Sequence, residues 1–192
     1  MDFSRMEEVR TGWSGDRKYH AWDNGGQEYF LRLSPPEKWE KAQRAFALQK
    51  KAFQLGLPVS EPLELTQEDG QVRFVERWLS GRMAEDALPA LPQEEQYRLG
   101  REAGRVLRAL HGCPAPVEAE DWESRFNKKL DRKIQVYREC PLQYQNGEAF
   151  IRYMEENRGL LWGRPQCVQH GDYHTGNMML CESRLFVIDF DR

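Results

Sequence analysis

The chain has 192 residues and a formal net charge of −3. Hydrophobic residues make up 40% and aromatic residues 11%, which is too much for a disordered chain. The weak acidity excludes the strongly basic surface that is typical of nucleic-acid-binding domains. No run of roughly 18 apolar residues is present, and the start "MDFSRMEEVR" lacks the apolar segment of a secretory signal. We therefore expect a soluble, cytoplasmic protein with neither nucleic acid nor a membrane as partner.

Residues 1–80 are predicted to form mostly strands and one helix. Two strand-like runs flank the sequence "DNGG", which is a strong signal for a hairpin turn. Apolar residues at helical spacing predict a helix over residues 37–55, and a glycine and a proline directly follow it. Two more strands are predicted on either side of Asp69-Gly70. The predicted order is hairpin, helix, hairpin.

The second part of the chain is predicted to be mainly helical. The stretch "SGRMAEDALPALPQEE" is predicted as the boundary between two lobes, residues 1–80 and 81–192. Apolar stripes predict helices over residues 94–111, 121–140 and 148–161. Two short strands follow, "NMMLC" and "LFVIDF".

The two last strands carry a group of polar residues. Asp172 lies on a turn before the first strand, Asn177 at the start of that strand, and Asp189 at the end of the second. A hairpin would bring Asn177 and Asp189 together, and both offer the hard oxygen ligands that suit Mg²⁺. Asp172 would face the same space and could accept a proton. Phosphoryl transfer from ATP needs these two elements.

The sequence "HGDYHTGN" followed by "IDFD" resembles the catalytic and metal-binding segments of the aminoglycoside phosphotransferase family. The resemblance implies an α+β, protein-kinase-like fold of two lobes. The N-terminal lobe would be an antiparallel sheet plus one helix, and the C-terminal lobe would be mainly helical with a catalytic hairpin. By the resemblance, Asp172 is the catalytic base, Asn177 and Asp189 bind magnesium, and His170 and His174 shape the loop.

Upstream segments extend the resemblance over nearly the whole chain. "TGWSGDRKYHAW" is similar to the family's first hairpin, whose glycines let backbone N–H groups approach the ATP phosphates. "YFLRL" is similar to the strand with the phosphate-binding cation, and "FVERWLSG" to the segment whose backbone binds adenine. The resemblance thus implies as ATP-binding residues Arg32, Gly12, Ser14, Gly15, Glu76 and Trp78.

Three departures from the family pattern stand out. The cation position holds Arg32, where lysine is the kinase norm. The following helix should carry a glutamate near Ala45, but Glu40 comes about a turn too early and Gln49 is neutral. The ion pair that positions the cation is therefore absent or replaced. The chain also stops at Arg192, before the C-terminal helices of the family, so we expect a fragment or a truncated gene.

The implied reaction is ATP- and Mg²⁺-dependent transfer of the γ-phosphoryl group to a hydroxyl of a small molecule, such as an aminoglycoside, another antibiotic or a metabolite. The acidic balance is compatible with a cationic acceptor. A catalytically impaired, nucleotide-binding pseudokinase fragment is the alternative. A metal-dependent hydrolase using His170, Asp172 and His174 is disfavoured, because the other two histidines lie far away in the sequence.

Overall fold

The computed structural model describes residues 1–10, 15–115 and 119–190. Contacts between residues group the chain into two compact units. One contains Met1–His111 together with Gln169–Arg192, and the other contains Gly112–Val168. Each unit is described by itself below, and the division into lobes at residue 80 stays a prediction.

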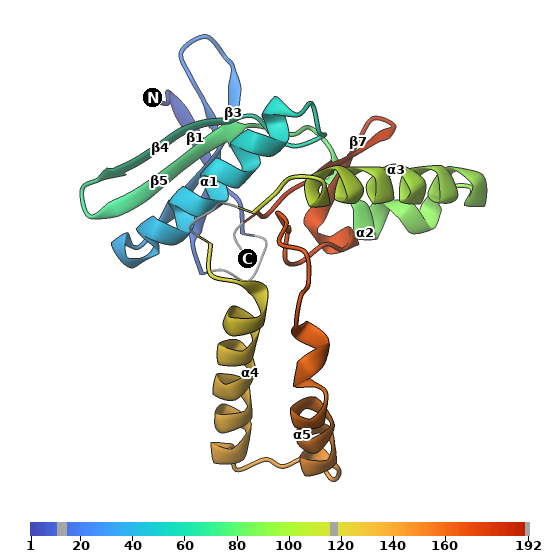
Figure 1. Cartoon of the computed structure of the whole chain (residues 1–192). Coiled ribbons are helices and arrows are strands. Elements are labelled where there is room, and N and C mark those ends of the chain that lie inside the picture. The colour runs from blue at the N-terminus through green and yellow to red at the C-terminus, as the bar shows by residue number, and fades with distance from the viewer. Residues whose placement is uncertain (11–14, 116–118, 191–192) are drawn as a thin grey trace. The chain divides into compact units, whose positions relative to one another are not determined.

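An antiparallel sheet of five strands in the order β1-β2-β3-β5-β4 forms one side of the first unit (Figure 1). Its strands are β1 (Arg5–Glu8), β2 (Arg17–Trp22), β3 (Glu28–Ser34), β4 (Pro62–Glu68) and β5 (Gln71–Arg77). Alternate side chains of β2, β3 and β5 form a buried cluster on one face, as period-2 patterning requires. At the β4–β5 turn Asp69 and Gly70 have φ of 51° and 71°, the left-handed conformations of a tight hairpin. Both predicted hairpins are thereby confirmed.

Helix α1 (Trp39–Gln54) follows the short 3₁₀ helix η1 (Pro36–Lys38) and contacts β4 and β5 (Figure 1). The predicted helix is confirmed within two residues at its start and one at its end. Its buried stripe consists of Ala42, Ala45, Gln49 and Ala52. Phe53, an apolar residue near the end of this helix, is 41% exposed. Small side chains on the stripe let the helix lie close to the sheet, and the bulky aromatic ring stays outside.

The stretch predicted as a boundary forms structure of its own. It contains β6 (Arg82–Met83), α2 (Ala84–Ala87) and the 3₁₀ helix η2 (Leu88–Ala90). Ala84 and Ala87 are fully buried in a cluster with residues of α3 (Gln93–His111) and of the last two strands. This segment therefore belongs to the core of the first unit.

The C-terminal hairpin is the last part of the first unit. The 3₁₀ helix η4 (Thr175–Asn177) leads into β7 (Met178–Cys181), which pairs with both β6 and β8 (Arg184–Val187). The N–H of Val187 donates to the carbonyl of Pro58 at 2.8 Å, which ties β8 to the segment after α1. The two predicted strands are confirmed, but the second ends at Val187, so Asp189 lies beyond it.

The second unit is a helical hairpin (Figure 1). It contains α4 (Trp122–Glu139), α5 (Gly147–Glu156) and the 3₁₀ helix η3 (Arg158–Leu161). Asp121 caps α4 by accepting from the N–H of Ser124 at 3.0 Å. The single helix predicted over 148–161 is wrong in its last turn, because the Asn157 side chain donates to the Tyr153 carbonyl at 2.7 Å and competes with helix continuation. Among the described ranges, no helix has the length and apolar content that a membrane span requires.

Candidate functional site

His170 anchors the loop before η4. Its ring is 1% exposed and packs edge-on against Phe190, with 4.9 Å between the ring centroids. Its Nε2 lies 2.9 Å from the carbonyl of Ile188, and the N–H of Asp172 donates to its Nδ1 at 3.3 Å. A carbonyl only accepts and an N–H only donates, so these contacts assign a neutral imidazole protonated at Nε2. His170 thereby joins the loop to the segment after β8.

Asp172 is held by the side chain of Asn177. The Asn177 amide donates to the main-chain carbonyl of Asp172 at 2.8 Å and to its carboxylate Oδ2 at 3.1 Å. His174 lies beside them, with Nε2 3.7 Å from the same Oδ2, and caps η4 by accepting from the N–H of Gly176 at 3.1 Å. The carboxylate is half-buried and oriented, as a group that accepts a proton from a hydroxyl must be.

Asp189 lies next to the same loop in an uncommon backbone conformation. The N–H of Ile188 donates to the carbonyl of Asn177 at 3.0 Å, so the hairpin brings Asp189 and Asn177 close together as predicted. Asp189 has φ of 65°, a left-handed conformation that strains most non-glycine residues and that aspartate adopts more readily than they do. Such strain concentrates at functional sites. Its carboxylate Oδ1 lies 4.0 Å from Nη1 of Arg32.

Arg32 on β3 is 14% exposed in its side chain. Its guanidinium carbon lies 5.0 Å from the centroid of the Phe74 ring. The carboxylate of Glu76 attracts it, and Gln49 of α1 donates a hydrogen bond to this carboxylate. Burial raises the pKa of Glu76, while the hydrogen bond from Gln49 and the charge of Arg32 oppose that rise. The attraction between Arg32 and Glu76 thus involves a carboxylate from β5, whereas α1 contributes the neutral Gln49. That the ion pair with a helix glutamate is absent or replaced stays a prediction.

An aromatic stack lies around Trp78, directly after β5. The ring of His20 is parallel to Trp78 within 5°, at 3.6 Å between the centroids, and its centroid lies 3.8 Å from that of Trp22. The Nε2 of His20 is 2.6 Å from a carboxylate oxygen of Glu28. The N–H of Trp78 donates to the Glu28 carbonyl at 3.3 Å, so this N–H already has a partner in the sheet.

Three predicted residues and two unpredicted contacts complete the comparison with the sequence. Gly15 has φ of 68°, which suits glycine, whereas Gly12 and Ser14 lie outside the described residues. The contacts of His20 with Trp78 and of Gln49 with Glu76 were not predicted from the sequence. Gln49 could have been found as the one polar residue on a helix stripe that otherwise carries alanine.

Asn177 and Asp189 offer oxygen atoms of the kind that Mg²⁺ prefers. Mg²⁺ prefers oxygen ligands and is usually bound through one or two carboxylates plus substrate phosphates. The amide nitrogen of Asn177 points to Asp172, so the side-chain oxygen is the atom suited to a metal. The described residues contain no group of three or more His, Cys, Asp or Glu side chains that could hold a metal ion. The oxygen donors fit Mg²⁺ better than the metal of a zinc-type hydrolase.

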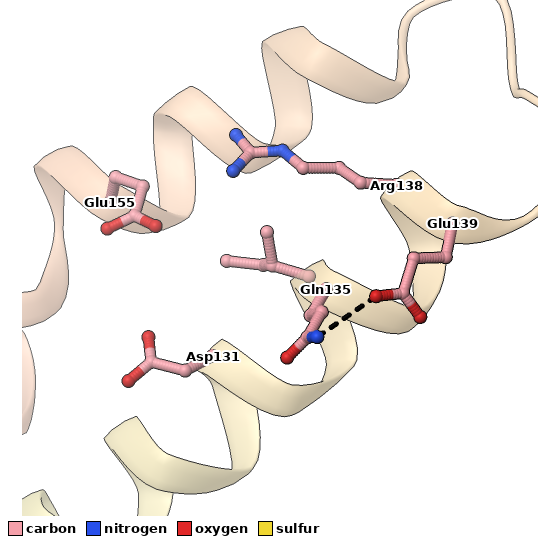
Figure 2. A pocket seen from close by; sticks show the side chains of 6 residues that line it. Asp131, Gln135, Arg138, Glu139 and Glu155 are labelled. Carbon is pink, nitrogen blue, oxygen red and sulfur yellow. Dashed lines mark hydrogen bonds between the residues drawn. The ribbon is translucent and has the colours of Figure 1, made fainter.

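A separate hollow of about 370 Å³ lies between α4 and α5 in the second unit (Figure 2). Its lining is charged and comprises Asp131, Ile134, Gln135, Arg138, Glu139 and Glu155. These groups are engaged with one another or with near neighbours. Gln135 donates to Glu139 at 2.9 Å, and Arg158 pairs with both Asp131 and Glu155, the latter at 2.6 Å. The hollow carries none of the predicted catalytic residues.

The sheet with one helix, the helices that follow and the hairpin at the end define a protein-kinase-like fold. The aminoglycoside phosphotransferase APH(2'')-Ib, solved with ADP, superposes with a TM-score of 0.71 at 17% identity, over 100% of this chain and 67% of that one. The amicoumacin kinase hAmiN, solved with AMP-PNP, Ca²⁺ and Ami, gives 0.66 at 17% identity, over 96% and 58%. The predicted fold class is confirmed.

The sequence profile of the phosphotransferase enzyme family matches residues 5–192, and the chain belongs to this family. The mouse protein acyl-CoA dehydrogenase family member 11 is 25% identical over 170 residues. That match covers 81% of this chain and 21% of the mouse protein, so the chain spans about a fifth of the relative's length.

Proposed function

We propose that the protein transfers the γ-phosphoryl group of MgATP to a hydroxyl group of a small molecule. The observation that carries the proposal is the joint placement of Asp172, Asn177 and Asp189. Asn177 holds the Asp172 carboxylate at 3.1 Å, and the hairpin brings Asp189 beside Asn177. This arrangement supplies a base and two oxygen ligands, the parts that phosphoryl transfer needs from a protein.

In the proposed mechanism the carboxylate of Asp172 accepts the proton of the acceptor hydroxyl. A bond forms between the acceptor oxygen and the γ-phosphorus, the bond from that phosphorus to the bridging oxygen breaks, and ADP leaves. Mg²⁺, when bound through Asn177 and Asp189, neutralises charge on the phosphates. Arg32 binds the phosphates through its planar guanidinium, which is matched to two phosphate oxygens at once.

We propose residues 1–80 as the nucleotide-binding lobe and 81–192 as the helical lobe with the catalytic loop. In the first, Gly15, with Gly12 and Ser14, would approach the phosphates, and the backbone of the segment with Glu76 and Trp78 would contact adenine. The ADP and AMP-PNP in the two structural relatives support the choice of nucleotide. The cytoplasm, where MgATP is available, is the proposed location.

The proposed acceptor is a small molecule with a free hydroxyl. The structural relatives are named for an aminoglycoside and for amicoumacin. The net charge of −3 of this chain is compatible with a cationic acceptor of that kind.

A second candidate function is nucleotide binding without transfer. The presence of Arg32 in place of lysine favours it, together with the absence of a glutamate near Ala45 of α1. A protein of this kind would bind MgATP and leave it intact.

A transfer assay separates the two candidates. The chain is incubated with Mg²⁺, ATP labelled in its γ-phosphate and a panel of small alcohols that includes aminoglycosides, and label in the acceptor is measured. We expect transfer by the native chain and a loss of about 10²–10⁴-fold in Asp172→Asn. Asp86→Asn, an exposed aspartate on α2, serves as the control and should transfer normally. MgATP binding with no transfer to any acceptor would favour the second candidate.

A further inference from the structure

The side chains of Arg32 and Glu76 share one face of the sheet. In the β3–β5 pairing Phe30 lies opposite Glu76, and Arg32 lies opposite Phe74. Arg32 and Glu76 are therefore diagonal neighbours, within reach of long side chains on the same face. That face is turned toward α1, because the ring of Phe46 on α1 packs edge-on against Phe74 at 5.4 Å.

Gln49 reaches this face from α1. Its side chain is 5% exposed, and its Nε2 donates to the carbonyl of Ser60 at 3.0 Å and to a carboxylate oxygen of Glu76. A primary amide has two N–H groups, and the two acceptors use both. The amide orientation is thus fixed, and with it the position of the Glu76 carboxylate.

Arg32 lies between two carboxylates. Asp189 is 4.0 Å away, and Glu76 attracts the guanidinium from the β5 side. Because the side chain of Arg32 is 14% exposed, water screens these interactions only partly. Asp189 is a proposed metal ligand, whereas Glu76 is engaged by Gln49. Glu76 can therefore hold the cation while Asp189 serves another partner.

We propose that Glu76 and Gln49 are positioning residues for Arg32, with the carboxylate supplied by β5 and held by an amide from α1. In a kinase-like site the carboxylate comes from the helix and pairs with a lysine. Here the helix offers an amide, the strand offers the acid, and the longer, forked arginine reaches both the acid and the phosphates. The amide of Gln49, the carboxylate of Glu76 and the guanidinium of Arg32 thus form one rearranged unit. The inference rests on the proposed function, since it assumes that Arg32 binds phosphate.

The test exchanges the two side chains. Dissociation constants of ATP and of adenosine, both with Mg²⁺, are measured by calorimetry for the whole chain and for Glu76→Gln, Gln49→Glu and the double variant. We expect Glu76→Gln to bind ATP about tenfold more weakly with adenosine binding unchanged, since only ATP carries the phosphates that Arg32 binds. The double variant keeps one carboxylate and one amide, and its ATP affinity should return to within about threefold of the native value. Glu68→Gln, an exposed residue of the same sheet, is the control.

The outcomes separate this inference from the proposed function. An unchanged ratio of ATP to adenosine affinity in Glu76→Gln, in a chain whose native form binds ATP, would overturn the inference alone. Equal weakening of both ligands would also overturn it, because a merely structural role moves both. If the native chain binds no ATP, the proposed function fails and the inference with it. If Glu76→Gln does not fold, as judged by thermal unfolding, the double variant decides: restored ATP affinity supports the inference, and weak ATP binding with normal adenosine binding contradicts it.

Discussion

The side-chain amide of Asn177 binds Asp172 at two points, its main-chain carbonyl at 2.8 Å and its carboxylate at 3.1 Å. One residue thus orients the proposed base, and its side-chain oxygen is the atom that we propose as a metal ligand. The proposed base and the proposed metal ligand are coupled, and a change in either is expected to disturb both.

Replacement of Asn177 by alanine tests this coupling. We expect ADP release with an active acceptor to fall about 10- to 100-fold and half-saturation by Mg²⁺ to need more metal, because base orientation and a ligand are lost together. The measurement is turnover over a Mg²⁺ titration. Asn157→Ala removes an amide in the second unit that donates to the Tyr153 carbonyl and should leave both values unchanged. Native Mg²⁺ dependence in Asn177→Ala would contradict the assignment.

The left-handed backbone at Asp189 is predicted to lower the stability of the chain. At φ of 65° alanine keeps the left-handed strain, whereas glycine relieves it, so Asp189→Gly should be more stable than Asp189→Ala by about 1 kcal/mol. Both variants lose the carboxylate, so the difference between them isolates the backbone. Urea unfolding gives the two free energies. At Asp86 in helix α2 the order should be reversed, since alanine favours the helix. Equal stability of the two Asp189 variants would show that no strain is stored there.

We predict that position 81 requires glycine, because β7 lies too close to it for a side chain. A Cβ at this position would lie 2.6 Å from the main-chain oxygen of Leu180 and 2.6 Å from the sulfur of Cys181. Gly81→Ala should therefore destabilise the chain by about 1–3 kcal/mol. The matched control is Gly104→Ala on α3, where a Cβ meets nothing within 4 Å and the change should stabilise by about 0.5–1 kcal/mol. We expect the two substitutions to change the free energy of unfolding in opposite directions. A Gly81→Ala variant as stable as the native chain would be at odds with the β6–β7 pairing.

Tyr173 is predicted to make the stability of the fold fall at high pH. Burial raises the pKa of Tyr173 to about 12, and its hydroxyl donates to the carbonyl of Ala103 at 2.7 Å. An unfolded tyrosine titrates near 10, so the folded state binds the proton more tightly. The resulting stability is complete below about pH 10 and is lost as the pH rises through about 12.

Denaturant unfolding between pH 8 and about 12 in the native chain and in Tyr173→Phe measures this effect. Tyr173→Phe should be less stable by about 1 kcal/mol near neutral pH, because a carbonyl loses its donor, and should lose less stability at high pH. Tyr97→Phe on α3, whose ring is 70% exposed, should follow the native profile. Parallel profiles for the native chain and Tyr173→Phe would argue against the buried hydroxyl.

Local signals explain what the sequence predicted well. The turn at Asp69-Gly70 requires left-handed backbone that these residue types tolerate, and the alternation along β2 and β3 set their buried face. The offsets between Asp172, Asn177 and Asp189 span only a short hairpin, so their proximity could be read from the sequence.

Long-range pairing explains what the sequence did not predict. The two residues of β6 carry too little pattern to be recognised, and only β7 makes them a strand. The stretch around Ala84 was predicted as a boundary between lobes because the composition shifts after it, yet its small residues Ala84 and Ala87 pack in a cluster with α3. A carboxylate for Arg32 was sought on the helix, whereas the carboxylate that we propose for it, Glu76, lies on β5. Periodicity along one segment carries no information about which segment lies opposite.

The most direct test of the central claim is calorimetric titration of this chain with ATP, with and without Mg²⁺, beside Asp189→Asn. Asparagine tolerates left-handed backbone and removes only the charge, so the variant should fold as the native chain does. We predict micromolar binding of ATP by the native chain that depends on Mg²⁺, and loss of the Mg²⁺-dependent part in Asp189→Asn. The assignment of the site would be contradicted if the native chain did not bind ATP. It would also be contradicted if the native chain bound ATP equally well with and without Mg²⁺ and the variant bound it with the same affinity.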